Sequence, residues 1–200
     1  MANAPEATDD DLIERIAAAD RGAFELLYRR HYAKMFHFVM RMTKQRELAE
    51  EVVDDTFFAV WRSAGAFAGR SSVSTWLFGI GHRQALKALE RNRRPLEVAC
   101  EDEELHAHAD LRGDADPQAN AAGSEMSTLL GRGIDALSDS HRGVIELAAM
   151  GHSALEIAEI VGCPEATVRT RMFHARAQLT KFLGRAQAPV TGIFGSRKNA

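Results

Sequence analysis

Residues 153–176 read SALEIAEIVGCPEATVRTRMFHAR and decide the fold of the C-terminal part of the chain. Ser153 and Glu156 have the spacing of a capping box, in which each side chain satisfies a free backbone N–H at a helix start. Gly162 suits the left-handed conformation of a tight helix end, and Pro164 suits the first turn of the next helix. A short helix, a glycine turn and a long basic helix form the helix-turn-helix pattern, whose second helix enters the major groove of DNA.

The second of these helices has one apolar stripe and one basic, polar side. A basic side alone is also typical of a solvated surface, but the capped helix and the glycine turn before it favour DNA contact. Arginines on such a helix bind phosphates in a salt-dependent way, and some bind guanine edges through two hydrogen bonds. The predicted DNA-binding residues are Thr167, Arg169, Thr170, Arg171, His174 and Arg176.

The N-terminal half of the chain is also predicted to be helical. Proline is absent between Ala7 and Arg94, and apolar residues recur there at helical spacing, which predicts helices over residues 20–42, 46–62 and 73–93. The second helix has an acidic outer face, formed by Glu47, Glu50, Glu51, Asp54 and Asp55. A stretch rich in glycine and serine precedes the third helix.

The third helix contains two glycines and ends in a basic segment. Gly79 and Gly81 lie in its interior, where each should cost about 1 kcal/mol relative to alanine. Glycine- and serine-rich loops next to aromatic and basic residues suit single-stranded nucleic acid, because bases stack on aromatic rings and phosphates contact basic groups. A plain connection between helices is the alternative interpretation.

Charge divides the chain into two units. Residues 95–125 carry one basic and nine acidic side chains, while the whole chain has a net charge of −3. This acidic segment contains several helix breakers and few large apolar residues, so we expect a flexible, exposed linker. The predicted fold is therefore all-α, with two small helical domains, 1–94 and 126–183, joined by the acidic linker 95–125 and followed by a disordered tail, 184–200.

Composition argues against several classes of protein. The 200 residues contain no apolar run near the roughly 18 that a membrane span needs, and the first residues are acidic, unlike a secretory signal. We therefore expect a cytoplasmic protein without membrane insertion. The two cysteines, Cys100 and Cys163, indicate neither a disulfide framework nor a zinc site. His106 and His108 have no further ligands at suitable spacing, so no metal is expected.

The sequence contains no motif on which an enzyme mechanism could rest. A glycine-rich phosphate loop, a Gly-x-Ser-x-Gly elbow and a His-Glu-x-x-His pair are all missing from it. We predict a protein that is not an enzyme, binds no cofactor and has no small-molecule substrate.

Three stretches together resemble one family. They are ELAEEVVDDTF at residues 47–57, with Trp61 after it, FAGRSSVSTWL at residues 67–77, and the helix-turn-helix at residues 155–176. In this order, around an acidic linker, they resemble the extracytoplasmic-function (ECF) sigma factors, group IV of the sigma-70 family. These proteins are bacterial transcription initiation factors with two helical domains, called region 2 and region 4.

The resemblance implies core RNA polymerase and promoter DNA as partners. The polymerase would be contacted through its β′ clamp helices and its β flap. The residues expected on the clamp helices are Glu50, Glu51, Asp54 and Asp55, and charge complementarity would account for their acidity. An anti-sigma factor, which holds such proteins inactive, is a further implied partner.

The resemblance also assigns the two promoter elements. The loop after residue 66 would accept a base flipped out of the minus-ten element, and the following helix would hold the melted strand. The residues implied for this element are Phe67, Arg70, Ser71, Ser72, Trp76, His82, Arg83, Lys87 and Arg91. The helix-turn-helix would bind the minus-thirty-five element as duplex, and the genes served would respond to stress or another signal.

A stand-alone helix-turn-helix regulator remains the alternative function. Such a protein would bind an operator as a dimer and use its N-terminal unit to sense a signal. It needs neither an acidic docking helix nor the loop from Phe67 to Trp76, so the N-terminal unit distinguishes the two hypotheses. A small hydrolase or metal-dependent enzyme would need a cluster of acidic residues and histidines, which the sequence does not supply.

Overall fold

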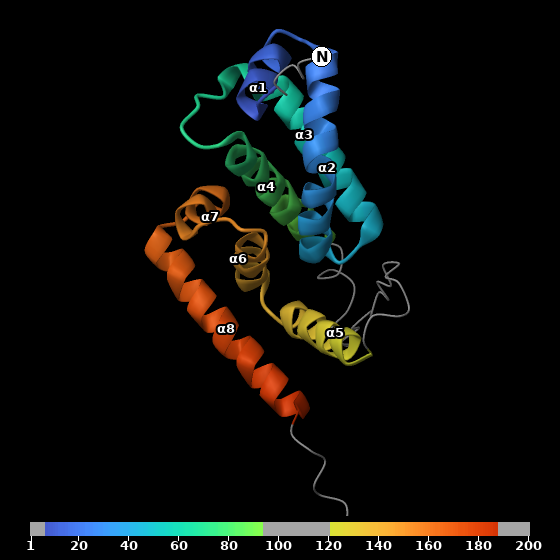
Figure 1. Cartoon of the computed structure of the whole chain (residues 1–200), viewed down its shortest axis with the longest axis vertical. Coiled ribbons are helices and arrows are strands. Elements are labelled where there is room, and N and C mark those ends of the chain that lie inside the picture. Colours follow the sequence, from blue (N-terminus) through green and yellow to red (C-terminus); the bar gives the residue numbers. More distant parts are fainter. Residues whose placement is uncertain (1–6, 94–120, 188–200) are drawn as a thin grey trace, which may run out of the picture.

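In a computed structural model that describes residues 7–93 and 121–187, all regular elements are helices (Figure 1). The first range contains α1 (Asp9–Ala17), α2 (Arg21–Thr43), α3 (Arg46–Ser63), a short 3₁₀ helix η1 (Ala64–Ala66) and α4 (Val73–Arg93). The second contains α5 (Ala121–Asp135), α6 (Asp139–Ala149), α7 (Ala154–Val161) and α8 (Glu165–Gln187). The predicted all-α class is confirmed.

The N-terminal unit, α1 to α4, is a bundle around large apolar side chains. Its fully buried residues include Leu27, Phe38, Phe57 and Phe78. The three helices predicted from periodicity are α2, α3 and α4, and their ends agree with the expectation to within one residue. Asp20 caps α2 by accepting hydrogen bonds from the backbone N–H groups of residues 22 and 23.

Helix α1, which was not predicted from the sequence, is fixed to α2 by a partly buried polar cluster. The Asp9 carboxylate lies 2.9 Å from Arg30 Nη1 and 2.6 Å from His31 Nε2. Burial opposes ionisation of Asp9, but the hydrogen bonds and charges of Arg30 and His31 outweigh it and lower its pKa. The carboxylate is therefore held ionised between the two helices.

The C-terminal unit, α5 to α8, contains the predicted helix-turn-helix. Ser153 Oγ accepts from Glu156 N, and the Glu156 carboxylate accepts from Ser153 N, which confirms the capping box before α7. Gly162 ends α7 with a φ of 68°, a left-handed conformation that glycine adopts without strain. Helix α8 begins directly after Pro164.

Two predicted boundaries differ from the helix ends observed. Helix α5 begins at Ala121, inside the segment predicted as linker, and α8 continues to Gln187, past the predicted domain end at residue 183. In α5, Met126, Leu130 and Ile134 recur at four-residue spacing, which is a helical period. The rest of the predicted linker and tail, residues 94–120 and 188–200, lies outside the described residues.

The two units share one hydrophobic core. Helix α4 packs against α7 and α2 packs against α6, as Figure 1 shows, and the buried cluster runs from Leu12 in α1 to Val168 in α8. In the first unit, Phe78 contributes to this cluster, and in the second, Ile157 and Ile160 do. From the sequence, two separate domains were predicted, and no contact between them was.

Candidate polymerase and nucleic-acid interfaces

The acidic face predicted on the second helix lies on α3. Glu47, Glu51, Asp54 and Asp55 are exposed, and Glu50 is partly exposed. Two of these carboxylates form ion pairs: Glu50 with Arg46 at 3.0 Å, and Glu51 with Arg91 of α4 at 2.8 Å. Exposed ion pairs are weak, so a basic partner can displace them at little cost.

An exposed aromatic residue that the sequence analysis did not single out lies in this acidic face. Phe58 is 60% exposed and follows Asp54 and Asp55 by one helical turn. Its neighbour at the next turn, Arg62, lies 5.7 Å from the ring centre. Large exposed aromatic residues are typical of the energetic centres of protein interfaces.

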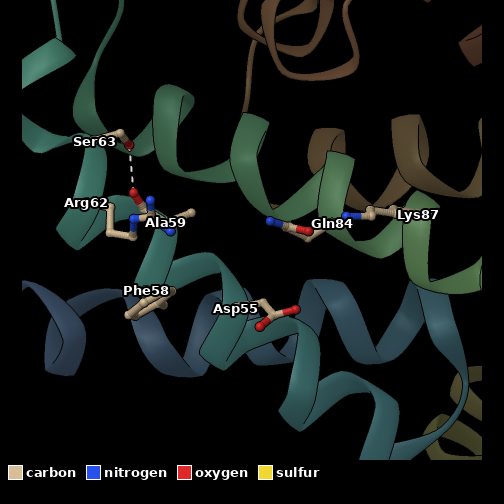
Figure 2. A pocket seen from close by; sticks show the side chains of 7 residues that line it. All are labelled: Asp55, Phe58, Ala59, Arg62, Ser63, Gln84 and Lys87. Carbon is tan, nitrogen blue, oxygen red and sulfur yellow. Dashed lines mark hydrogen bonds between the residues drawn. The ribbon is translucent and has the colours of Figure 1, made fainter.

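Phe58 borders a shallow pocket between α3 and α4. Figure 2 shows Asp55, Phe58 and Arg62 on one wall and Gln84 and Lys87 on the other. The pocket has a volume of about 360 Å³, and two of its lining residues are joined within α3, where Ser63 Oγ donates to the Ala59 carbonyl at 2.7 Å. It therefore joins the predicted polymerase residues to the predicted minus-ten residues.

The connection between α3 and α4 brings two of the predicted minus-ten residues together. The rings of Phe67 and Trp76 lie 5.1 Å apart and are both half-buried. Ser72 Oγ accepts from the Thr75 backbone N–H at 3.1 Å, which is the geometry of a helix cap. Arg70 is exposed and Ser71 is partly exposed. Ser72 thus has a structural role, whereas the aromatic pair forms the wall of the loop.

On α4 the predicted minus-ten residues divide between two sides of the helix. Trp76, Arg83, Lys87 and Arg91 follow one another at helical spacings of seven, four and four, and the three basic residues are exposed. His82 lies apart from this stripe. Its side of α4 faces the C-terminal unit, and only 6% of its surface is exposed.

His82 is buried in a positively charged environment. Burial first, and then the charges of Arg83 and of Arg171 on α8, lower its pKa from 6.5 to about 4. The ring therefore stays neutral at physiological pH. In this conformation His82 packs between the two units and is not available to a DNA strand.

The predicted minus-thirty-five residues lie in the N-terminal half of α8. Arg169, Thr170, His174 and Arg176 are exposed, whereas Thr167 and Arg171 are half-buried. Arg169 pairs with Glu165 one turn earlier. Arg171 Nη1 lies 3.8 Å from Cys163 Sγ, so this side chain is held back toward the turn.

Phe173 is the residue of this face that the sequence analysis missed. It is 69% exposed, and its ring lies 5.5 Å from that of His174. The apolar stripe of α8 consists of Val168, Met172, Ala175, Leu179 and Phe182, and position 173 lies outside it. A phenylalanine outside the apolar stripe was the available sequence signal that residue 173 faces outward.

The described residues include neither a metal-binding cluster nor a membrane-spanning helix. Residues 7–93 and 121–187 contain no group of three or more histidine, cysteine or acidic side chains placed to hold a metal ion. Of the helices in these ranges, none is long and apolar enough to cross a membrane.

Two family models match the chain. The one described as Sigma-70 region 2 matches residues 27–95, and the one described as Sigma-70, region 4 matches residues 127–179. The first match covers α3, α4 and their connection, and the second covers the helix-turn-helix.

Curated relatives match over most of their length. The chain is 31% identical over 183 residues to the RNA polymerase sigma-H factor of Pseudomonas aeruginosa, covering 88% of this chain and 93% of that protein. It is 32% identical over 181 residues to the ECF RNA polymerase sigma-E factor of Haemophilus influenzae, covering 88% and 95%. With the sigma-E factor of Escherichia coli K12 it shares 33% identity over 174 residues, covering 84% and 91%.

Two solved structures have a similar fold. One is CnrH in complex with the cytosolic domain of CnrY, with a TM-score of 0.62, 24% identity and coverage of 88% of this chain and 97% of that one. The other is the sigma factor RpoE in complex with the anti-sigma factor NepR from Bartonella quintana, with a TM-score of 0.62, 23% identity and coverage of 80% and 96%.

Proposed function

Because the chain belongs to the ECF sigma factors of the sigma-70 family, and is thus a non-enzymatic RNA polymerase sigma factor, we propose specific surfaces for its partners. The observation that carries the proposal is the presence of both regions, with their acidic and basic faces, in one chain. A stand-alone regulator does not require region 2, so the match of residues 27–95 to region 2 favours the sigma-factor function over the regulator.

Core RNA polymerase binds the acidic face of α3. Glu50, Glu51, Asp54 and Asp55 attract a basic surface of the polymerase, here the β′ clamp helices, and Phe58 supplies an apolar contact at the centre. Charges around an aromatic anchor combine fast association with a slow dissociation rate. The β flap is the proposed contact of region 4.

The minus-ten element binds along the aromatic pair and the basic stripe. Phe67 and Trp76 offer ring surfaces for an unstacked base, and Arg83, Lys87 and Arg91 face the phosphates of the melted strand. Flipping a base out of the stack costs a few kcal/mol, which stacking and phosphate contacts offset. Arg70 and the serines at 71 and 72 border the same loop.

The minus-thirty-five element binds the exposed side of α8 as duplex DNA. Arg169 and Arg176 are placed for phosphate or guanine contacts, and Thr170 and His174 lie between them. Phe173 faces the same side and contributes an apolar contact, for which the methyl group of thymine is the suitable target.

Regulation and location follow from the family. We propose that an anti-sigma factor binds this chain, as the anti-sigma factor NepR binds RpoE in one of the two similar structures. We also propose that the protein acts in the cytoplasm and that its genes respond to stress or another signal.

In the first experiment the purified chain is mixed with bacterial core RNA polymerase that lacks any sigma factor. Gel filtration then measures binding, and transcription from a genomic promoter library measures initiation. We expect co-elution and defined start sites. Asp54→Lys/Asp55→Lys should abolish co-elution, whereas Arg169→Ala/Arg176→Ala should co-elute and lose starts that depend on the upstream element. Arg29→Ala, on the exposed surface of α2, is the matched control. Tight binding to duplex DNA without core binding would instead identify a stand-alone regulator.

A second experiment tests Phe173 alone. Replacing each thymine of a mapped upstream element by uracil removes only the methyl group. One such replacement should weaken duplex binding by the wild-type chain and leave binding by Phe173→Ala unchanged. Equal effects on both proteins would exclude the methyl contact.

A further inference from the structure

Helix α1 (Asp9–Ala17) has no role in the function proposed above. It precedes residues 27–95, the range that the Sigma-70 region 2 model matches. Its side chains Leu12, Ile13 and Ile16 are nevertheless almost completely buried. Helices shorter than about 12 residues are only marginally stable alone in water. The position of α1 is therefore set by the two parts of the N-terminal unit that it contacts.

The first contact is the partly buried polar cluster at the start of α1. Asp9 binds Arg30 and His31 of α2. Arg30 Nη1 also donates to the Ala7 carbonyl at 2.7 Å, just before the helix. Hydrogen bonds between charged groups are stronger than those between neutral groups. These bonds therefore fix the start of α1 to α2.

The second contact is with η1, at the start of the connection between α3 and α4 (residues 64–72), which we call the minus-ten loop. Figure 1 shows α1 beside this loop, and α1 packs against η1. Ile13, Ile16 and Ala64 belong to one buried cluster. At the surface, a Cβ atom on Gly65 would lie 3.9 Å from Ala17 Cβ, an ordinary van der Waals separation. The 3₁₀ helix is therefore held against the C-terminal half of α1.

Phe67 follows η1 directly and is bonded to it. Its backbone N–H donates to the Ala64 carbonyl at 3.1 Å, and its ring lies 5.1 Å from that of Trp76. The other end of the minus-ten loop is held by the Ser72 cap on α4. Residues 68–70, between these two ends, are exposed. The conformation of Phe67 therefore depends on η1, and the position of η1 depends on α1.

We propose that α1 positions the minus-ten loop: through η1 it holds Phe67 in the conformation that accepts an unstacked base, and Asp9 is the positioning residue that keeps α1 in place. This inference rests on the minus-ten function proposed above for Phe67 and Trp76. A loop that is ordered before binding avoids the free-energy cost of becoming ordered on the DNA. The melted strand therefore meets an aromatic wall that is already formed.

Asp9→Ala tests this role in holoenzyme assembled from the full chain and core RNA polymerase. The substitution removes the bonds to Arg30 and His31. If the competent loop is then populated about 10% of the time, its apparent affinity falls about tenfold. Fluorescence anisotropy should show about tenfold weaker binding to a promoter fragment with a single-stranded minus-ten element, and unchanged binding of the chain to core polymerase. Asp10→Ala, an exposed change in the same turn, should alter neither affinity.

A double-mutant cycle shows whether α1 acts through Phe67. Phe67→Ala removes the ring that α1 is proposed to position. Asp9→Ala should therefore weaken DNA binding much less in the Phe67→Ala chain than in the wild type. Weakening of the same size in both chains would mean that Asp9 does not act through Phe67.

A reversible cross-link tests whether the position of α1 on η1 is what matters. The separation of 3.9 Å between Ala17 Cβ and a Cβ at Gly65 is one that a disulfide can span. Ala17→Cys/Gly65→Cys is combined with Asp9→Ala in a chain whose Cys100 and Cys163 are replaced by serine. Oxidation should restore most of the DNA binding of the wild type, and a reductant should remove it again.

Three results would overturn the proposal: unchanged DNA binding by Asp9→Ala, equal losses for Asp9→Ala and Asp10→Ala, or no recovery on oxidation. If Asp9→Ala does not fold, Asp9→Asn replaces it in every arm, with a smaller expected loss, because it keeps the shape of the side chain and removes its charge.

Failure of the proposed function gives a different result. In that case the wild-type chain does not bind core polymerase, or its holoenzyme does not bind the promoter fragment. Amide hydrogen exchange in the free chain then still decides whether α1 holds η1. The Phe67 N–H, bonded to the Ala64 carbonyl, should exchange faster in Asp9→Ala than in Asp10→Ala.

Discussion

Gly79 and Gly81 differ in what their missing side chains permit. Helix propensity predicts that both glycines weaken α4, because glycine is a poor helix former. A Cβ atom on Gly81 would lie 2.5 Å from Met35 Sδ and 3.1 Å from Met35 Cε, inside the N-terminal bundle. Gly79 instead faces Ile160 of the other unit. Helix propensity alone disfavours both glycines. Close packing against Met35 accounts for Gly81, and the contact between the two units accounts for Gly79.

Gly81→Ala should destabilise the protein despite its better helix propensity. The added methyl group overlaps the Met35 thioether, and overpacking of this kind costs about 1–3 kcal/mol, against a propensity gain of about 1 kcal/mol. Urea denaturation should show a free energy of unfolding lower by about 1 kcal/mol. Gly131→Ala is the control, because a Cβ there meets nothing within 4 Å, and it should be neutral or stabilising. Stabilisation by Gly81→Ala would contradict the packing described.

Acid should weaken the contact between the units through His82. Its pKa is about 4 while the two units are in contact, against an ordinary value of 6.5, so above pH 6.5 the ring is neutral whether or not the units are in contact, and the contact keeps its full stability. As the pH falls from 6.5 toward 4, the chain with separated units binds the proton preferentially, and at pH 5 the contact loses up to about 2 kcal/mol. His152, whose pKa is also lowered by burial, adds an effect of the same sign.

Scattering between pH 8 and pH 5 measures this effect. The wild type should expand on acidification, and His82→Gln, which cannot titrate at this position, should expand less. Equal expansion of the two proteins would show that His82 does not control the contact.

Helices with several local sequence signals could be predicted, and helices with fewer such signals could not. Caps, breakers and apolar periodicity lie within a few residues of one another, so α2, α3, α4 and α7 could be located from sequence. Helix α1 was missed although Thr8 and Asp11 form a capping box at its start, because its nine residues carry few apolar periods and its place depends on Asp9 contacting α2. The exposure of Phe58 and Phe173 was missed because a phenylalanine on a helix is usually buried. For Phe173 its position outside the apolar stripe of α8 was the available signal, whereas the exposure of Phe58 is shown by the packing.

The capping box of α7 should contribute measurably to stability. Ser153→Ala removes the hydroxyl that accepts from Glu156 N at 3.3 Å, and the loss of such a cap costs about 1 kcal/mol. The expected decrease in unfolding free energy is of that size in urea denaturation. Ser138→Ala is a matched control, because Ser138 precedes α6 and its hydroxyl contacts His141 Nδ1 at 2.9 Å but caps no backbone N–H. Equal losses in the two variants would contradict a special role for the box.

Over the whole molecule, the sequence predicted the surfaces but not how they face one another. The acidic face of α3 and the basic face of α8 are properties of single helices, which periodicity identifies. The burial of His82 depends on α4 meeting α6 and α7, with Gly143 of α6 close to the ring. Such a contact joins residues more than 50 positions apart, and no local pattern encodes it.

Arg142→Lys should weaken the contact between the two units, although it keeps the positive charge. The Arg142 guanidinium donates to the carbonyls of Asp135 at 3.0 Å and Leu137 at 2.7 Å, near the end of α5, and to the Met42 carbonyl at 3.3 Å, near the end of α2. A lysine ammonium has no planar fork and cannot bind these carbonyls together. Each buried carbonyl left without a donor costs about 1–3 kcal/mol.

We therefore expect Arg142→Lys to lower the unfolding free energy by about 2–4 kcal/mol, and to raise the radius of gyration at denaturant concentrations where the chain is still helical. Circular dichroism and scattering on the same samples separate opening from unfolding. Arg132→Lys, an exposed change on α5, should alter neither quantity. A chain with Arg142→Lys that keeps wild-type stability and compactness would show that the charge alone holds the two helix ends, and that the fork of hydrogen bonds contributes little.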